Sequence, residues 1–114
     1  MLPELTTLQQ VADAIDAAKD KQNLLLLKFG AKWCKPCKMI APLAQQLVKS
    51  NSDRLMGFEV DVDVVVEALQ QFNVSKLPTF VLIYKGNVHS TWTGADSQEL
   101  ENRVYAALDH LQSL

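Results

Sequence analysis

The sequence predicts a single α/β domain in which helices cover both faces of a central mixed sheet. Three observations support this fold class. Residues 24–29 form a predicted strand that is apolar on both faces apart from Lys28, strands alternate with helices as far as residue 72, and a hairpin follows residue 78. Strands that alternate with helices pair in parallel, whereas a hairpin adds an antiparallel edge. The length of 114 residues fits one domain, at residues 1–114, with a core of its own.

The first half of the chain contains two predicted helix–strand units. Thr6 or Thr7 is a suitable N-cap for a first helix, because apolar residues then recur at helical spacing. The strand at 24–29 follows, and Pro36 suits the first turn of a second helix. A second strand is predicted at 55–62, where apolar and acidic residues alternate towards its end.

The second half adds a short helix, a hairpin and a last helix. Helical spacing of apolar side chains predicts the short helix at 64–72, despite three valines. The run TFVLIY at 79–84 is a strand, and a tight turn at 86–87 returns the chain as a second strand, VHSTW. A helix from residue 96 or 97 to about residue 110 completes the predicted order α, β, α, β, α, β, β, α.

Composition and charge exclude several classes of protein. The net charge of −2 gives no reason to expect nucleic acid or an anionic membrane as a partner. The longest apolar runs end at Lys28 and Lys85, far short of the ~18 residues of a membrane span. The first twenty residues carry four acidic side chains and lack a basic start and an apolar segment, unlike a signal or transit peptide. We therefore expect a cytoplasmic protein, although an organelle such as the mitochondrion stays open, and we expect a monomer.

Cys34 and Cys37 are the only cysteines, so a secreted scaffold with several disulfides is excluded. They lie where the buried strand passes into the helix that Pro36 begins. Unpaired N–H groups and the macrodipole at a helix N-terminus stabilise an anion, which should lower the pKa of the Cys34 thiol. Lys35 and Lys38 add positive charge that favours the thiolate. Cys34 is therefore the candidate nucleophile, and Cys37, one turn later, is the cysteine that resolves the mixed disulfide.

Three other uses of the cysteine pair have less support. A structural disulfide or an inert pair suits a core, whereas Trp33 and Pro36 frame an exposed turn. A zinc site wants four ligands, and only two cysteines and two distant histidines, His89 and His110, are available. An iron–sulfur cluster would need a second chain to complete four thiolates. Dithiol–disulfide exchange without a metal is therefore the favoured interpretation.

Four segments carry a wider similarity: KWCKPCKMIAPLAQQL at 32–47, VDVD at 60–63, FNVSKLPTF at 72–80 and TGA at 93–95. Through them the chain resembles the thioredoxin family over nearly its whole length. The resemblance implies the thioredoxin fold and a protein disulfide oxidoreductase that uses the Cys34–Cys37 disulfide and no other cofactor. It also implies protein disulfides as substrates and a reductase, or another dithiol donor, as the source of electrons.

The resemblance further implies a substrate surface around the two cysteines. Pro78 would be a cis-proline, with the cis bond after Leu77, and extended substrates would dock through the Leu77 backbone. A leucine–proline pair that opens a strand makes sense without the family. The implied substrate-binding residues are Trp33, Lys35, Pro36, Leu77, Pro78, Thr93, Gly94 and Ala95. The open alternative is that Trp33 and Trp92 are only partly exposed surface aromatics.

Three positions depart from the family pattern. Lys35 stands between the cysteines where the family usually has glycine. Gly30 stands where the family commonly has an aromatic or other side chain, which leaves less packing beneath the active-site turn. Lys28 replaces the buried aspartate that resembles a general base for the resolving cysteine.

Lys28 needs a partner, since a buried charge without one is costly. Strand alternation puts Lys28 on the face of Leu24 and Leu26, and the family register puts Glu59 beside it on the neighbouring strand. The family usually has a lysine in place of Glu59, so the ion pair is predicted to be inverted. The alternative is that Lys28 reaches out to the rim of the sheet.

The inverted pair has a chemical consequence. A cation ~6 Å from a sulfur, at an effective dielectric near 20, would stabilise a thiolate by roughly 2–3 kcal/mol, and screening and Glu59 would cut this to under half. We therefore predict catalytic roles for Lys28 and Glu59 and a dithiol more oxidising than that of ordinary thioredoxin. Cys37 would lose its proton to Glu59 through water or to an uncharged Lys28. The second hypothesis is a thioredoxin-like binding or adaptor module with weak redox activity, and the third is a thiol oxidase or isomerase.

Overall fold

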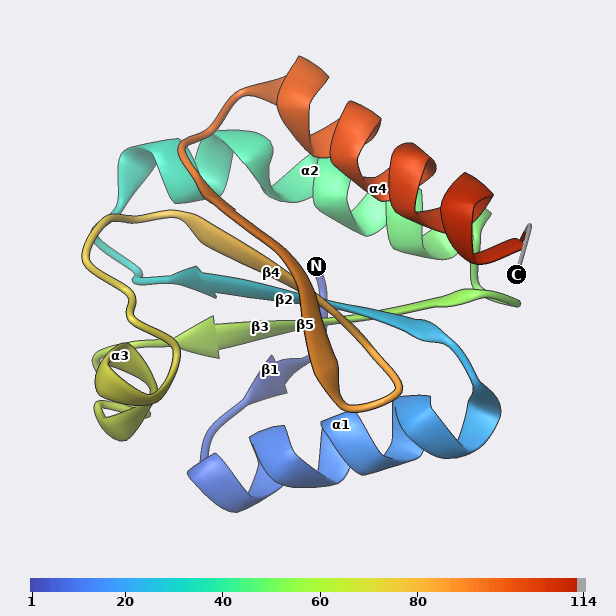
Figure 1. Cartoon of the computed structure of the whole chain (residues 1–114). Coiled ribbons are helices and arrows are strands. Elements are labelled where there is room, and N and C mark those ends of the chain that lie inside the picture. The colour runs from blue at the N-terminus through green and yellow to red at the C-terminus, as the bar shows by residue number, and fades with distance from the viewer. Residues whose placement is uncertain (113–114) are drawn as a thin grey trace.

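The structure is a computed structural model that describes residues 1–112. In this part of the chain, five strands form one mixed sheet with helices on both faces (Figure 1). The elements are β1 (Glu4–Leu5), α1 (Leu8–Lys21), β2 (Leu24–Gly30), α2 (Lys35–Ser50), β3 (Leu55–Asp61), α3 (Glu67–Gln71), β4 (Thr79–Tyr84), β5 (Asn87–Thr93) and α4 (Ser97–Gln112). Helices α2 and α4 lie on one face of the sheet, and α1 and α3 lie on the other (Figure 1). This arrangement confirms the predicted fold class. None of these helices is long and apolar enough to cross a membrane.

Strand β2 lies at the centre of the sheet, in the order β1–β3–β2–β4–β5. It pairs in parallel with β3 and antiparallel with β4, and the short β1 pairs in parallel with β3. Every residue of β2 is buried, which explains why its sequence is apolar on both faces. The register sets Lys28 beside Glu59 of β3, as predicted, and beside Phe80 of β4.

Two apolar cores lie on the two faces of the sheet. Leu25, Leu27 and Phe29 of β2 belong to the core under α1 and α3. Leu24 and Leu26 belong to the core under α2 and α4. Because side chains alternate along a strand, the lysine of β2 shares the second face and points towards the layer of α2.

Two local predictions differ from the structure, and one strand was not predicted. The short helix α3 begins later than predicted, because the N–H groups of Val64 and Val65 first bond to the Asp61 carbonyl in turns. The hairpin turn lies at Lys85 and Gly86, both with positive φ, one residue earlier than predicted. Strand β1 was not predicted, because two residues show no periodicity.

Trp92 is a core residue, so the alternative that it is a partly exposed surface aromatic is wrong. Only 5% of its surface is exposed. Its ring stacks on Phe80 with the centroids 5.3 Å apart, and the Arg103 guanidinium lies 5.2 Å from its centroid. Helix α4 supplies the cover, since its buried side chains share a core with Trp92.

Candidate active site

The cysteine motif begins α2 directly after the carboxyl end of β2. A turn closed by the bond from Cys34 N–H to the Ala31 carbonyl, at 3.1 Å, brings Cys34 to the N-cap of the helix. Cys34 and Cys37 form a disulfide, with their Cα atoms 5.3 Å apart, and both are buried. The Cys37 N–H donates to Cys34 Sγ at 3.2 Å. A backbone donor of the first helical turn is therefore aimed at the sulfur that the sequence predicts as nucleophile.

Positive charge surrounds the start of α2. Lys32, Lys35, Pro36 and Lys38 are all exposed, and α2 contains no acidic residue. The helix dipole is therefore not opposed by a carboxylate of its own helix. In the reduced protein, this field and the N–H donor would favour the thiolate form of Cys34.

Trp33 is a surface residue that is held in place. Its side chain is 70% exposed, and its indole Nε1–H donates to Asp63 Oδ2 at 2.7 Å. The Asp63 N–H in turn donates to Asp61 Oδ1 at 2.9 Å. These bonds tie the cysteine turn to the loop after β3 and present a large apolar ring next to the nucleophile in sequence. Sequence reasoning missed Asp63, because the bond joins two loops that no strand register relates.

The segment before β4 lies at the same end of the sheet as the cysteines. The Leu77–Pro78 bond is cis, as predicted. In the sheet register Thr79 pairs with Phe29 of β2, from which the chain runs on to Cys34. Leu77 is partly buried and packs against the core that contains both cysteines. The predicted cis-proline therefore lies at the same end of the sheet as the cysteine turn.

The segment after β5 lies beside Pro78. Thr93 pairs with Thr79, and the Gly94 N–H donates to the Pro78 carbonyl at 2.9 Å. Gly94 has φ of +101°, a conformation that favours glycine, and Thr93 and Ala95 are exposed. The predicted substrate-binding residues thus come to one end of the sheet, and what they bind stays a prediction.

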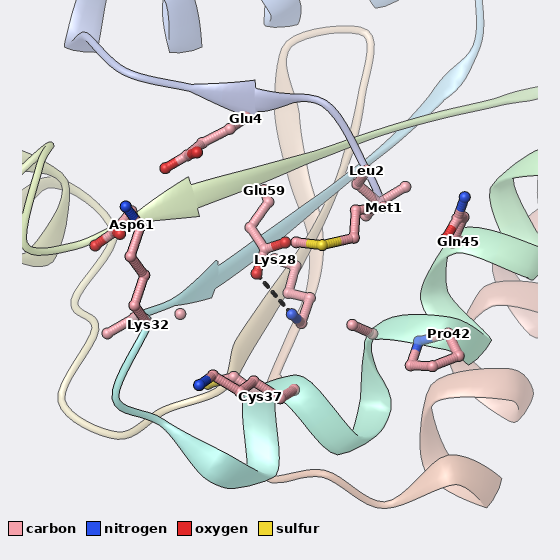
Figure 2. Close-up of a pocket in the computed structure, with 14 residues that line it drawn as sticks. Met1, Leu2, Glu4, Lys28, Lys32, Cys37, Pro42, Gln45, Glu59 and Asp61 are labelled. Carbon is pink, nitrogen blue, oxygen red and sulfur yellow. Dashed lines mark hydrogen bonds and ion pairs between the residues drawn. The ribbon is translucent and has the colours of Figure 1, made fainter.

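Lys28 and Glu59 form the predicted ion pair (Figure 2). Lys28 Nζ lies 2.7 Å from Glu59 Oε1. The lysine side chain is 1% exposed and the glutamate side chain is 18% exposed. The alternative that Lys28 reaches the rim of the sheet is therefore wrong. Glu59 instead compensates a cation that is buried in the sheet.

A cavity of about 350 Å³ opens beside this pair, between the N-terminal segment, β2, β3 and α2 (Figure 2). Gly30 lines this cavity together with Cys37 of the disulfide. A Cβ atom at Gly30 would lie 3.2 Å from Cys37 Sγ and 3.5 Å from Glu59 Oε1. The resolving cysteine and the carboxylate therefore line a common space next to Gly30. The sequence signal for this space is Gly30 itself.

The two histidines are closer together than their separation in sequence indicated. The ring centroids of His89 and His110 lie 5.8 Å apart, because the end of α4 lies beside β5. His89 lies near the hairpin, at the end of β5 opposite to Thr93. Over the described part of the chain, no group of three or more His, Cys, Asp or Glu side chains is placed to hold a metal ion.

Comparisons with known proteins point to one family. The family model described as Thioredoxin matches residues 6–106. The chain is 37% identical over 90 residues to thioredoxin H4 of Arabidopsis thaliana, and the aligned residues make up 79% of this chain and 76% of that protein. It is 33% identical over 94 residues to thioredoxin H3 of Arabidopsis thaliana, and the aligned residues make up 82% of this chain and 79% of that protein.

Solved thioredoxin structures share the fold. A thioredoxin h of poplar has a TM-score of 0.88 at 29% identity, over 94% of this chain and 96% of that chain. The germline-specific thioredoxin Deadhead of Drosophila melanogaster has a TM-score of 0.85 at 28% identity, over 92% of this chain and 98% of that chain. Since the match in sequence spans most of the chain and includes the disulfide at the start of α2, the protein belongs to the thioredoxin family of thiol–disulfide oxidoreductases.

Proposed function

We propose that the protein reduces disulfides of other proteins by dithiol–disulfide exchange, with Cys34 as nucleophile and Cys37 as resolving cysteine. A reductase or another dithiol donor restores the dithiol. The observation that carries this proposal is the position of Cys34 at the N-cap of α2, where the Cys37 N–H donates to its sulfur. A thiolate in that position is stabilised before the substrate arrives. The cytoplasmic location and the monomeric state stay predictions.

In the first step the Cys34 thiolate attacks one sulfur of the substrate disulfide. A Cys34–substrate disulfide forms, the substrate disulfide breaks, and the second substrate sulfur leaves as a thiolate. The exposed Trp33 ring and the Leu77–Pro78 segment are proposed to hold the substrate chain near Cys34. Their positions at one end of the sheet support this role. Further residues proposed to contact the substrate are Lys35, Pro36, Thr93, Gly94 and Ala95.

In the second step Cys37 loses its proton and attacks the Cys34 sulfur. We assign the proton acceptor to Glu59, through a water molecule in the space beside Gly30, because that space touches both Cys37 Sγ and Glu59 Oε1. Lys28 is a positioning residue in this scheme, since its Nζ donates to Glu59 Oε1 and holds the carboxylate. The Cys37 thiolate then expels the reduced substrate as a thiolate and closes the Cys34–Cys37 disulfide.

The redox potential is expected to lie above that of ordinary thioredoxin. Lys28, whose charge Glu59 offsets in part, and the exposed Lys32, Lys35 and Lys38 bring positive charge to the region of the dithiol. A more stable thiolate means a more stable reduced form. A stabilisation of about 1.4 kcal/mol corresponds to ~30 mV for this two-electron couple, so we expect about −240 mV against about −270 mV for thioredoxin. Equilibration with glutathione buffers, followed by alkylation of the free thiols, measures the potential.

The Lys28→Asp/Glu59→Lys double variant is the matched control for this measurement. It restores the usual acid–lysine arrangement of the family without a change of net charge. Its potential should fall towards that of ordinary thioredoxin. A wild-type potential at or below about −270 mV, or a double variant with an unchanged potential, would count against the proposal.

Reduction of insulin driven by dithiothreitol tests the proposed function. The chain should accelerate precipitation of the insulin B chain relative to dithiothreitol alone, whereas protein alkylated at both cysteines should not. A chain that binds partners around Trp33 without accelerating insulin reduction would instead be an adaptor module. A chain that forms disulfides in reduced substrates faster than it reduces insulin would be an oxidase or isomerase.

A further inference from the structure

The cavity beside Cys37 has the size and lining of a small-molecule site. Its volume of about 350 Å³ falls within the ~300–1,000 Å³ of typical ligand pockets and exceeds the ~150 Å³ that accommodates benzene. Its wall is mostly apolar, and Ala41 and Pro42 of α2 contribute to it. Figure 2 shows the Lys28–Glu59 pair on the strand side of this space and Cys37 on the helix side.

Gly30 makes the cavity reach the resolving cysteine. The glycines with positive φ are Gly86 and Gly94, so the backbone at Gly30 does not require glycine. A Cβ at this position would lie 3.2 Å from Cys37 Sγ. Any larger residue would therefore fill the space next to the sulfur, and glycine keeps that space open.

Glu59 is the acceptor that the cavity offers to a ligand next to Cys37. Its side chain keeps 18% exposure, while the ammonium group paired with it belongs to a side chain with 1% exposure. Beyond this ion pair, the charged side chains that line the cavity are Lys32, Lys38, Glu4 and Asp61, two of each sign. These side chains therefore supply no excess charge that would select an ionic ligand. Apolar walls with an acceptor next to the Cys37 sulfur favour a neutral ring that carries an N–H donor.

We propose that this cavity binds a neutral, planar heteroaromatic molecule of one or two rings, whose N–H group donates to the Glu59 carboxylate and whose ring covers Cys37 Sγ. Such a ligand buries its apolar faces against α2 and pairs its donor with the exposed acceptor. Binding needs only the folded chain and no thiol–disulfide exchange. A bound ligand also excludes water between Glu59 and Cys37, so it slows the second step, an effect that rests on the proposed function.

Titration of oxidised, isotope-labelled protein with indole tests the proposal without redox chemistry. The backbone amide signals of Gly30, Ala31, Cys37 and Ala41 should shift saturably, with a dissociation constant on the order of 0.1–1 mM for a ligand of this size. Indene has nearly the same shape but no N–H group, and it should bind about tenfold more weakly because the bond to the carboxylate is lost. Shifts that do not saturate or lie elsewhere, or equal affinities for the two ligands, would overturn the proposal.

Cavity-filling variants supply the second test. Ala41→Leu extends a side chain into the cavity and should weaken indole binding at least about fivefold, whereas Ala12→Leu, at an exposed position of α1, should leave it unchanged. If Ala41→Leu fails to fold, Gln45→Phe, at an exposed residue of the cavity wall, replaces it. Full affinity in a folded cavity variant would overturn the proposal. Insulin reduction by the wild-type chain is measured separately, so a failure of the proposed function is distinguishable from this outcome.

Discussion

Replacement of Cys37 by serine is expected to lower the rate of insulin reduction about a thousandfold and to trap the substrate on Cys34. The variant keeps the nucleophile but lacks the sulfur that closes the disulfide, so the reaction stops at the mixed disulfide. Dithiothreitol must then release the substrate. An intramolecular thiol at an effective concentration of even about 1 M outcompetes ~1 mM dithiothreitol about a thousandfold. Initial rates measure the loss, and mass spectrometry of the intact protein measures the trapped adduct.

Cys34→Ser is the matched control, because it changes the same atom at the other cysteine. This variant should reduce insulin no faster than dithiothreitol alone and should trap no substrate. The reason is local: the backbone donor at the helix start is aimed at Cys34 Sγ, so Cys34 is the sulfur prepared for attack. An adduct on Cys37 in this control, or undiminished turnover of Cys37→Ser, would show that the two roles are assigned the wrong way round.

The centre of the site was predictable because β2 is apolar on both faces. A lysine in such a strand demands a partner, and strand alternation decides which face it occupies. The family resemblance then supplied the register, and the structure has Glu59 as the neighbour of Lys28 at 2.7 Å. A similar local argument placed Cys34 at a helix N-terminus, where it is the N-cap of α2.

Contacts that no strand register relates were beyond this kind of prediction. The bond from Trp33 to Asp63 joins loops 30 residues apart, and the contact of His89 with His110 depends on how α4 packs against β5. The interpretation of Trp92 as a surface aromatic was left open because its position has no clear role in the family. Helix α4 covers Trp92, and no local pattern in the hairpin indicates it.

The size of the cavity also could not be predicted from local sequence patterns. Gly30 predicted less packing beneath the active-site turn, and the structure has open space there. Its volume, however, depends on where α2 and the N-terminal segment lie relative to β2 and β3. Local periodicity determines the identity of these elements, whereas the distances between them follow from the packing of the whole chain.

Replacement of Glu59 by leucine is expected to lower the free energy of unfolding by about 3–5 kcal/mol. The change leaves the Lys28 ammonium, on a side chain with 1% exposure, without its carboxylate. Lys28→Met should cost less, about 2 kcal/mol, because the Glu59 side chain keeps 18% exposure and can still be hydrated. Urea denaturation followed by circular dichroism measures both free energies, on the assumption of two-state unfolding for a domain of this size.

The double variant Lys28→Met/Glu59→Leu measures how much the ion pair contributes to stability, separately from the effect of removing one partner alone. It should lie within about 1 kcal/mol of the wild type, because apolar side chains replace a buried ion pair with little net cost. Lys49→Met, at an exposed position of α2, controls for the loss of a lysine and should change stability by less than about 0.5 kcal/mol. Losses that simply add in the double variant would mean that the two side chains are not coupled.

The double variant also separates stability from chemistry. If Glu59 accepts the proton of Cys37, the folded double variant forms the mixed disulfide at Cys34 at an ordinary rate but resolves it on the order of a hundredfold more slowly. If the pair serves only the fold, the double variant regains wild-type stability and carries out both steps at wild-type rates. Stopped-flow measurement of the two steps in one folded protein therefore decides whether the buried lysine of β2 supports the sheet alone or also positions the base for the second half of the reaction.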